Sequence, residues 1–140
     1  MDKKAVYEVI DSKASEFAAL SDAIWDHAEL DFTEHQSAEA LCRQLDTEGF
    51  AVTRGVAGSE TPFTARYGSG KPVIGILGEF DALSGLSQKA GCAVREPLCP
   101  GAAGHGCGHN MFGVGSIAAA AGVKKYLEDT GHSGTVVYFG

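Results

Sequence analysis

The order of secondary structure predicted for the second half of the chain constrains its fold more than any other feature. Residues 72–77 form a continuous apolar run, which predicts a strand buried on both faces of a sheet. Residues 110–129 predict a helix with many small side chains, and residues 135–139 predict a further strand. A strand, a long connection, a helix and a strand in this order are typical of an α/β sheet covered by helices. Because ligands in such sheets bind beyond the carboxyl ends of the strands, we expect a functional site at that edge.

Two helices are predicted ahead of these elements. Apolar side chains recur at steps of three and four through residues 5–30, which gives that segment one apolar face. Ser21 and Asp22 mark the point where this helix is expected to bend or restart. Residues 34–48 predict a second helix, and Gly49 is placed to end it.

The middle of the chain predicts two more strands and then a long irregular segment. The strands are expected at residues 50–56 and 62–67. Residues 78–108 show no period and contain seven of the 19 glycines. A segment of about 30 residues without regular structure in a compact domain is usually functional. Asn110, directly after this segment, is expected to cap the following helix.

Composition indicates one soluble globular domain over residues 1–140, with 44% hydrophobic and 21% charged residues. The net charge of −7, without a long run of lysine or arginine, argues against a nucleic acid or an acidic membrane as partner. No apolar stretch is long enough to span a bilayer, and no secretory signal precedes the first helix. We therefore expect a cytoplasmic protein with four reduced cysteines, although a disulfide between Cys92 and Cys99 is also compatible with the sequence.

The chemistry of the chain is concentrated in the string Gly-His-Gly-Cys-Gly-His-Asn at residues 104–110. Cysteine and histidine are side chains that hold zinc and similar metals. In an extended backbone Cys107 and His109 point to the same side and can share a metal ion, and His105 is a candidate further ligand. Two other interpretations are a glycine-rich turn around an ordinary cysteine and a nucleophilic Cys107 activated by a neighbouring histidine. The residue types favour the metal site.

Two carboxylates follow the strand predicted at residues 72–77. Glu79 and Asp81 come directly after it, at the edge where the Cys/His string is also expected. A carboxylate there can ligate a metal, or accept a hydrogen bond from a ligating histidine and so fix its tautomer. The alternative is a solvated strand end or the cap of a short helix at residues 82–83. The glycines of this region complete neither a dinucleotide fingerprint nor a phosphate loop.

Three strings of the sequence together resemble a known family: Gly-Glu-Phe-Asp-Ala-Leu at residues 78–83, Gly-Leu-Ser-Gln at 85–88, and the Cys/His string at 104–110. The family is that of the aminoacylase/carboxypeptidase-type zinc amidohydrolases and peptidases, and the branch is that of the aminobenzoyl-glutamate utilisation hydrolases. The resemblance extends over most of the chain. It implies an α/β fold with three layers, helix/sheet/helix, in which residues 1–140 are the N-terminal part of a zinc-exopeptidase-like catalytic domain.

The resemblance also implies a binuclear site, with zinc or manganese, that cleaves an amide bond to an amino acid. The expected substrates are small amides, either aminobenzoyl-glutamate-like compounds or N-acyl amino acids. Cys107 and His109 match metal ligands of the family, and Asp81 matches a carboxylate that orients the metal centre without binding it. Glu79 stands where related branches place another ligand or carboxylate.

The chain departs from the family in what it lacks. The family's adjacent Glu-Glu pair, a general base beside a metal ligand, does not occur in the 140 residues. Two later ligating histidines and an inserted dimerisation domain are also expected only further along a family member. We therefore expect the isolated chain to be inactive in hydrolysis and to associate with a second copy or a completing chain. A metal-binding or protein-interaction module without catalysis is the alternative.

Overall fold

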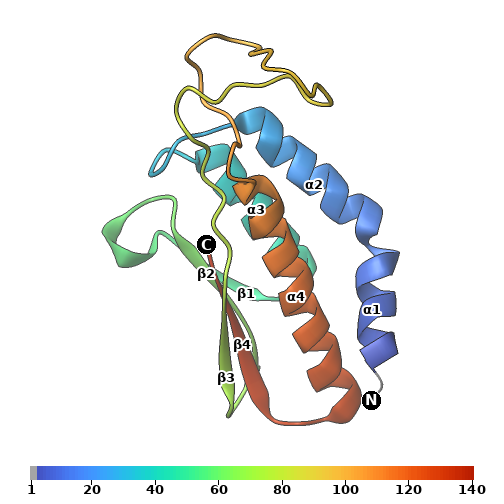
Figure 1. Cartoon of the computed structure of the whole chain (residues 1–140). Helices are drawn as coiled ribbons and strands as arrows, with labels where there is room; N and C mark the ends of the chain where they lie inside the picture. Colours follow the sequence, from blue (N-terminus) through green and yellow to red (C-terminus); the bar gives the residue numbers. More distant parts are fainter. Residues whose placement is uncertain (1–2) are drawn as a thin grey trace.

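The computed structural model describes residues 3–140, in which four α-helices accompany one four-stranded sheet (Figure 1). The elements in chain order are α1 (Lys3–Ser12), α2 (Ala14–His27), α3 (His35–Thr47), β1 (Ala51–Arg54), a short 3-10 turn η1 (Val56–Gly58), β2 (Phe63–Ser69), β3 (Val73–Leu77), α4 (His109–Thr130) and β4 (Gly134–Phe139). The predicted α/β fold class is confirmed.

The sheet has the strand order β1-β2-β4-β3. β1 and β2 form an antiparallel pair, β2 and β4 form another, and β3 and β4 are parallel. The parallel pair is connected through residues 78–108 and α4, because parallel neighbours need a crossover of this kind. β3 and β4 therefore end at the same edge of the sheet, as the sequence predicts.

In residues 3–140 the helices lie on one side of the sheet. α3 and α4 pack on the sheet, whereas α1 and α2 pack against α4 (Figure 1). The opposite face carries Val73, Leu77 and Phe139, which are exposed. In residues 3–140 the sheet thus has helices on one face, and the second helical layer of the predicted three-layer arrangement is not among these residues.

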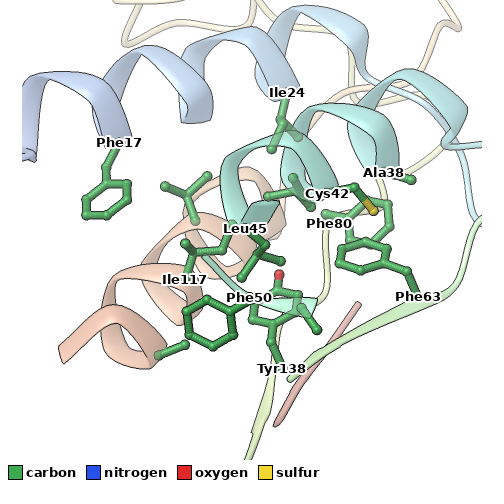
Figure 2. Packing of buried hydrophobic residues seen from close by; sticks show 14 of the residues in the cluster. Phe17, Ile24, Ala38, Cys42, Leu45, Phe50, Phe63, Phe80, Ile117 and Tyr138 are labelled. Carbon is green, nitrogen blue, oxygen red and sulfur yellow. The ribbon is translucent and has the colours of Figure 1, made fainter. Parts of the chain in front are cut away.

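The core lies between the helices and the sheet (Figure 2). Its fully buried side chains come from both layers and include Ile24, Leu41, Leu45, Phe63, Ile117, Val136 and Tyr138. The Tyr138 hydroxyl lies 3.3 Å from the carbonyl oxygen of Gly78 and 3.1 Å from that of Gly113, and it donates to this pair. Burial raises the pKa of Tyr138, so the hydroxyl stays a donor. Since Ser116 Oγ also donates to the Leu77 carbonyl at 2.7 Å, the first turns of α4 are fixed against the end of β3.

The N-terminal helix prediction is correct in type and wrong in the position of the break. The structure divides the segment at Lys13, and α2 continues through Ser21 and Asp22. Lys13 has φ −107° and ψ 6°, outside the helical region. Its Nζ forms an ion pair with the buried carboxylate of Glu48, at 2.5 Å. This partner lies far along the chain, so local periodicity cannot indicate the break.

The other two helices match their predicted ranges within one residue at each end. Gly49 follows α3 with φ +83°, a left-handed conformation that glycine adopts without strain, as predicted. α4 begins at His109 after Gly108, which has φ +79°, so the prediction of a cap at Asn110 is wrong. Asn110 lies inside the first turn, and its side-chain amide donates to Ser21 Oγ at 3.0 Å.

The prediction that residues 72–77 are buried on both faces is also wrong for residues 3–140. β3 is an edge strand there and pairs only with β4. Val73 and Leu77 on the outer face are 59% and 57% exposed, and Ile74 on the inner face is also exposed. Of this strand, Ile76 is the residue that packs against the core. A continuous apolar run is typical of a strand on which other residues pack at both faces. Within residues 3–140 few residues pack on β3.

The four cysteines are unpaired, as predicted, so no disulfide joins Cys92 and Cys99. Cys42 is buried, whereas Cys99 and Cys107 are exposed. Among the helices of residues 3–140, none combines the length and the apolar character that crossing a membrane requires.

Candidate metal centre

The residues that follow β3 are held beside the segment that precedes α4. Leu83 and Gly104 exchange backbone hydrogen bonds of 3.0 Å in an isolated antiparallel bridge. On the other side, Ala82 N–H donates to the Glu29 carbonyl at 2.8 Å, and Ala82 forms a parallel bridge with Leu30. These two bridges join three segments that are distant in sequence. They bring the predicted carboxylates and the Cys/His string together, and the expected convergence at this edge is confirmed.

Gly104 is required at its place in the bridge. A Cβ atom there would lie 2.0 Å from the carbonyl oxygen of Leu86 and 2.5 Å from its carbonyl carbon. Backbone of the same connection therefore occupies the space that any other residue would need.

His109 lies between the two carboxylates that were predicted from the sequence. Its Nδ1 is 2.8 Å from Asp81 Oδ1, and its Nε2 is 3.1 Å from Glu79 Oε2. When Nδ1–H donates to Asp81, the neutral ring keeps its lone pair on Nε2. Glu79 then faces a nitrogen that can bind a cation, and its own carboxylate can bind the same cation.

The distance between Nε2 of His109 and Oε2 of Glu79 fits two ligands of one metal ion. In a tetrahedral zinc site with bonds of about 2.0–2.2 Å to nitrogen and oxygen, two ligand atoms lie about 3.3–3.6 Å from each other. The observed 3.1 Å is close to that separation. A carboxylate that fixes the other ring nitrogen is the usual second partner of a ligating histidine, and Asp81 occupies that place.

Cys107 precedes His109 by two residues in the sequence but does not join this group. Its thiol is exposed and forms no hydrogen bond or ion pair within residues 3–140. The described part of the chain also gathers no three histidine, cysteine or acidic side chains into one metal cluster. The lack of a histidine partner gives the nucleophile interpretation of Cys107 no support, since a catalytic thiol needs a base within hydrogen-bond reach.

The structure uses His105 differently from the prediction. The side chain is 5% exposed, and its Nε2–H donates to the carbonyl of Ile24 in α2 at 2.9 Å. Burial lowers the pKa of His105, and the hydrogen bond to Ile24 opposes that shift. Its Nδ1 is buried and has no hydrogen-bond partner in residues 3–140. This geometry supports a structural role for His105, because its ring joins the loop to α2. It does not support the candidate role of His105 as a metal ligand.

Two residues that support the site were missed from the sequence. The Glu29 carboxylate accepts hydrogen bonds from Ser37 N–H (2.9 Å) and Gln36 N–H (3.0 Å) at the start of α3. The Gln88 side chain donates to the carbonyl of Val94 at 2.9 Å and accepts from Glu96 N–H at 3.0 Å, which folds part of the long connection on itself. The contact of Glu29 has one local sign in the sequence: a glutamate precedes the helix α3, and the N-terminus of a helix attracts negative charge.

No protein-family model matches the chain. Among curated proteins, a subunit of the p-aminobenzoyl-glutamate hydrolase of Escherichia coli (strain K12) is 49% identical over 133 residues, which cover 95% of this chain and 28% of that protein. The Xaa-Arg dipeptidase of Mus musculus is 32% identical over 136 residues, which cover 90% of this chain and 28% of that protein. The chain thus spans less than a third of the length of these curated relatives.

Two solved structures share the fold. A protein from methicillin-resistant Staphylococcus aureus that is described as an aminohydrolase superposes with a TM-score of 0.77, at 21% identity, over 99% of this chain and 34% of that chain. A dinuclear metal-binding peptidase of the M20 family from Bacillus subtilis superposes with a TM-score of 0.74, at 21% identity, over 92% of this chain and 35% of that chain. At this identity the likeness shows the fold alone. The resemblance drawn from residues 78–110 is confirmed by the curated match, which extends over 95% of the chain.

Proposed function

We propose that this chain, a sequence relative of a p-aminobenzoyl-glutamate hydrolase subunit, is part of a metal-dependent amide hydrolase. Its reaction is the release of an amino acid from a small amide, of the aminobenzoyl-glutamate or N-acyl amino acid type. The observation that carries the proposal is the ordered group of Asp81, His109 and Glu79 at the end of β3. This group has the donor atoms and the spacing that metal ligands need, and Asp81 is placed to accept a hydrogen bond from Nδ1–H of His109, the tautomer that leaves the Nε2 lone pair for a metal.

The side chains have separate roles in this proposal. His109 Nε2 and the Cys107 thiolate bind the metal, and Glu79 is the candidate third ligand. Asp81 holds the proton on His109 Nδ1 and thereby keeps the lone pair on Nε2. A site with imidazole and thiolate ligands suits zinc, and carboxylate ligands also suit manganese. When bound, such a metal supplies polarisation of the amide carbonyl and a water nucleophile near neutral pH.

Residues 1–140 supply only part of this site. Three candidate ligands are fewer than the four of a tetrahedral site, and no adjacent pair of glutamates is present to act as general base and ligand. The proposal therefore requires further ligands and a base from polypeptide outside these 140 residues, in the same chain or in a second chain. The setting we propose is the cytoplasm.

The first test is metal stoichiometry. The purified chain is dialysed against zinc or manganese, then against buffer, and bound metal is measured by elemental analysis. We expect about one metal ion per chain in the parent, and loss of that ion in Cys107→Ser and His109→Ala. Cys99→Ser is the matched control, because Cys99 is also an exposed thiol of the same connection. Equal metal in the parent and both site variants, or none in any of them, contradicts the proposal.

A hydrolysis assay separates metal binding from catalysis, and metal-dependent from cysteine-dependent hydrolysis. The isolated chain is expected to bind metal and to leave aminobenzoyl-glutamate uncleaved. Turnover that a chelator abolishes would show that the 140 residues hold a complete site. Turnover that a thiol-alkylating reagent abolishes and a chelator does not would instead establish a cysteine hydrolase.

A further inference from the structure

The candidate metal ligands lie on a short segment with a buried polar residue at each end. Cys107 and His109 belong to residues 106–109, the ligand segment, and His105 and Asn110 stand directly before and after it. The side chains of these two anchor residues are 5% exposed, whereas Cys107 between them is exposed. Both candidate ligands are thus enclosed in the chain by residues that are fixed in the interior.

Both anchor residues bind the same turn of α2. His105 Nε2–H donates to the carbonyl of Ile24 at 2.9 Å, and Asn110 Nδ2 donates to Ser21 Oγ at 3.0 Å. Ser21 and Ile24 are three residues apart in α2 and therefore lie on one face of the helix. The Ile24 side chain is fully buried in the core, so the packing of α2 fixes the position of both acceptors. α2 therefore serves as a platform for the two ends of the ligand segment.

The middle of the ligand segment has few contacts of its own. Within residues 3–140 Cys107 forms no hydrogen bond. Its neighbours Gly106 and Gly108 have no side chain, and glycine leaves the backbone more freedom than any other residue. The ring of His109 is held by Asp81, but no such contact holds Cys107. The position of Cys107 therefore depends on how the ends of the segment are fixed.

We propose that His105 and Asn110 are positioning residues for the candidate metal ligands. Because they tie both ends of the ligand segment to one turn of α2, they restrict its backbone to few conformations. A segment that is already ordered loses less conformational entropy when a metal binds, so the metal binds more tightly. The effect on metal affinity rests on the function proposed above, whereas the restriction of the backbone requires no metal.

Two variants remove the anchors separately. His105→Leu removes the donor and keeps an apolar side chain in the interior, and the Ile24 carbonyl still accepts the Ala28 N–H at 3.2 Å. His105→Gln is the conservative variant, since its terminal amide can donate in place of the imidazole. Ser21→Ala removes the nearer acceptor of Asn110 without changing the ligand segment. It also decides the question if His105→Leu does not fold.

Tyr67→Phe is the matched control, because it deletes a hydroxyl that donates to Glu128 at 2.9 Å, outside the ligand segment and its anchors. The first readout is the backbone order parameter of residues 106–109, from ¹⁵N relaxation of the chelator-treated chain. We expect about 0.85 in the parent and in Tyr67→Phe, below about 0.6 in His105→Leu, and recovery in His105→Gln. Ser21→Ala should also lower it. Unchanged order parameters in both anchor variants would overturn the proposal.

The second readout is metal binding by the folded variants. Zinc affinity is measured by competition with a chelating indicator, and cobalt(II) reports the Cys107 thiolate through its charge-transfer absorption. His105→Leu should weaken zinc binding about tenfold and reduce the cobalt–thiolate band, while His105→Gln and Tyr67→Phe stay close to the parent. A merely structural role would lower stability and leave affinity and band unchanged, which would overturn the proposal. If the parent itself binds no metal, the proposed function fails, and the order parameters still decide whether the anchors restrict the segment.

Discussion

Replacing Gly78 by alanine tests how rigidly the end of β3 is held. A Cβ atom at this position would lie 2.1 Å from the Tyr138 hydroxyl oxygen and 2.4 Å from the ring carbon that bears it. Tyr138 is fully buried and stacks on Phe63 with ring centroids 5.7 Å apart, so the tyrosine has no free space to move into. The substitution should therefore displace either the strand end or the ring.

The magnitude follows from two costs. Forcing an extra methyl group into a packed core costs about 1–3 kcal/mol. If the hydroxyl also loses its carbonyl acceptors, the unpaired buried group adds about 1–3 kcal/mol. We expect Gly78→Ala to lower the free energy of unfolding by about 2–6 kcal/mol when both costs apply, which at about 2 kcal/mol per M of urea moves the urea midpoint down by on the order of 1–3 M.

Gly115→Ala is the matched control for this experiment. Gly115 lies in α4, and a Cβ atom there would have no neighbour within 4 Å. Alanine is a better helix former than glycine, so this variant should gain about 0.5–1 kcal/mol. Both variants are unfolded in urea and followed by far-ultraviolet circular dichroism. An unchanged midpoint in Gly78→Ala, or an equal loss in Gly115→Ala, would refute the reasoning from packing.

Three further predictions concern charge and reactivity. Burial disfavours the ionised Glu29, but hydrogen bonds from Ser37 and its neighbour outweigh burial and lower the pKa of Glu29 below its ordinary value of 4.5. Its stabilising effect is thus complete above pH 4.5 and is lost as the pH falls through the folded-state value, so Glu29→Gln should flatten the loss of stability in urea titrations at acidic pH. Burial raises the pKa of Cys42 to about 11, so iodoacetamide at pH near 8 should modify the other cysteines and spare Cys42 until urea is added, as mass spectrometry can count. Asp81→Asn should keep the fold by circular dichroism and weaken metal binding about 10–100-fold, because His109 loses the carboxylate that fixes its tautomer; unchanged affinity would count against that role.

The position of the candidate site could be predicted because its residues adjoin regular elements. Asp81 follows a strand and His109 begins a helix, and a crossover between parallel strands puts both positions at one edge of the sheet. The separate uses of His105 and His109 could not be predicted, because both are histidines with glycine neighbours. The packing of α2 decides between them, since the Ile24 carbonyl takes the Nε2–H of His105.

The features that the sequence did not reveal depend on residues far apart in the chain. The helix break at Lys13 coincides with an ion pair to Glu48, and no local pattern connects the two. The exposure of Val73 in β3 has a different cause. Apolar composition predicts what the strand is suited to contact, whereas the exposed fraction depends on which neighbours are present.

The bridges from Ala82 to Leu30 and from Leu83 to Gly104 have a consequence for the order of folding. Each is a single rung between segments distant in sequence, so the entropy of closing long loops opposes its formation until the core has collapsed. We therefore expect the loop segments that these rungs join to be among the last parts of the molecule to assemble, and among the first to open in local fluctuations. A ligand that binds only the assembled edge is in competition with this opening. Its apparent affinity decreases as the fraction of molecules with open rungs increases.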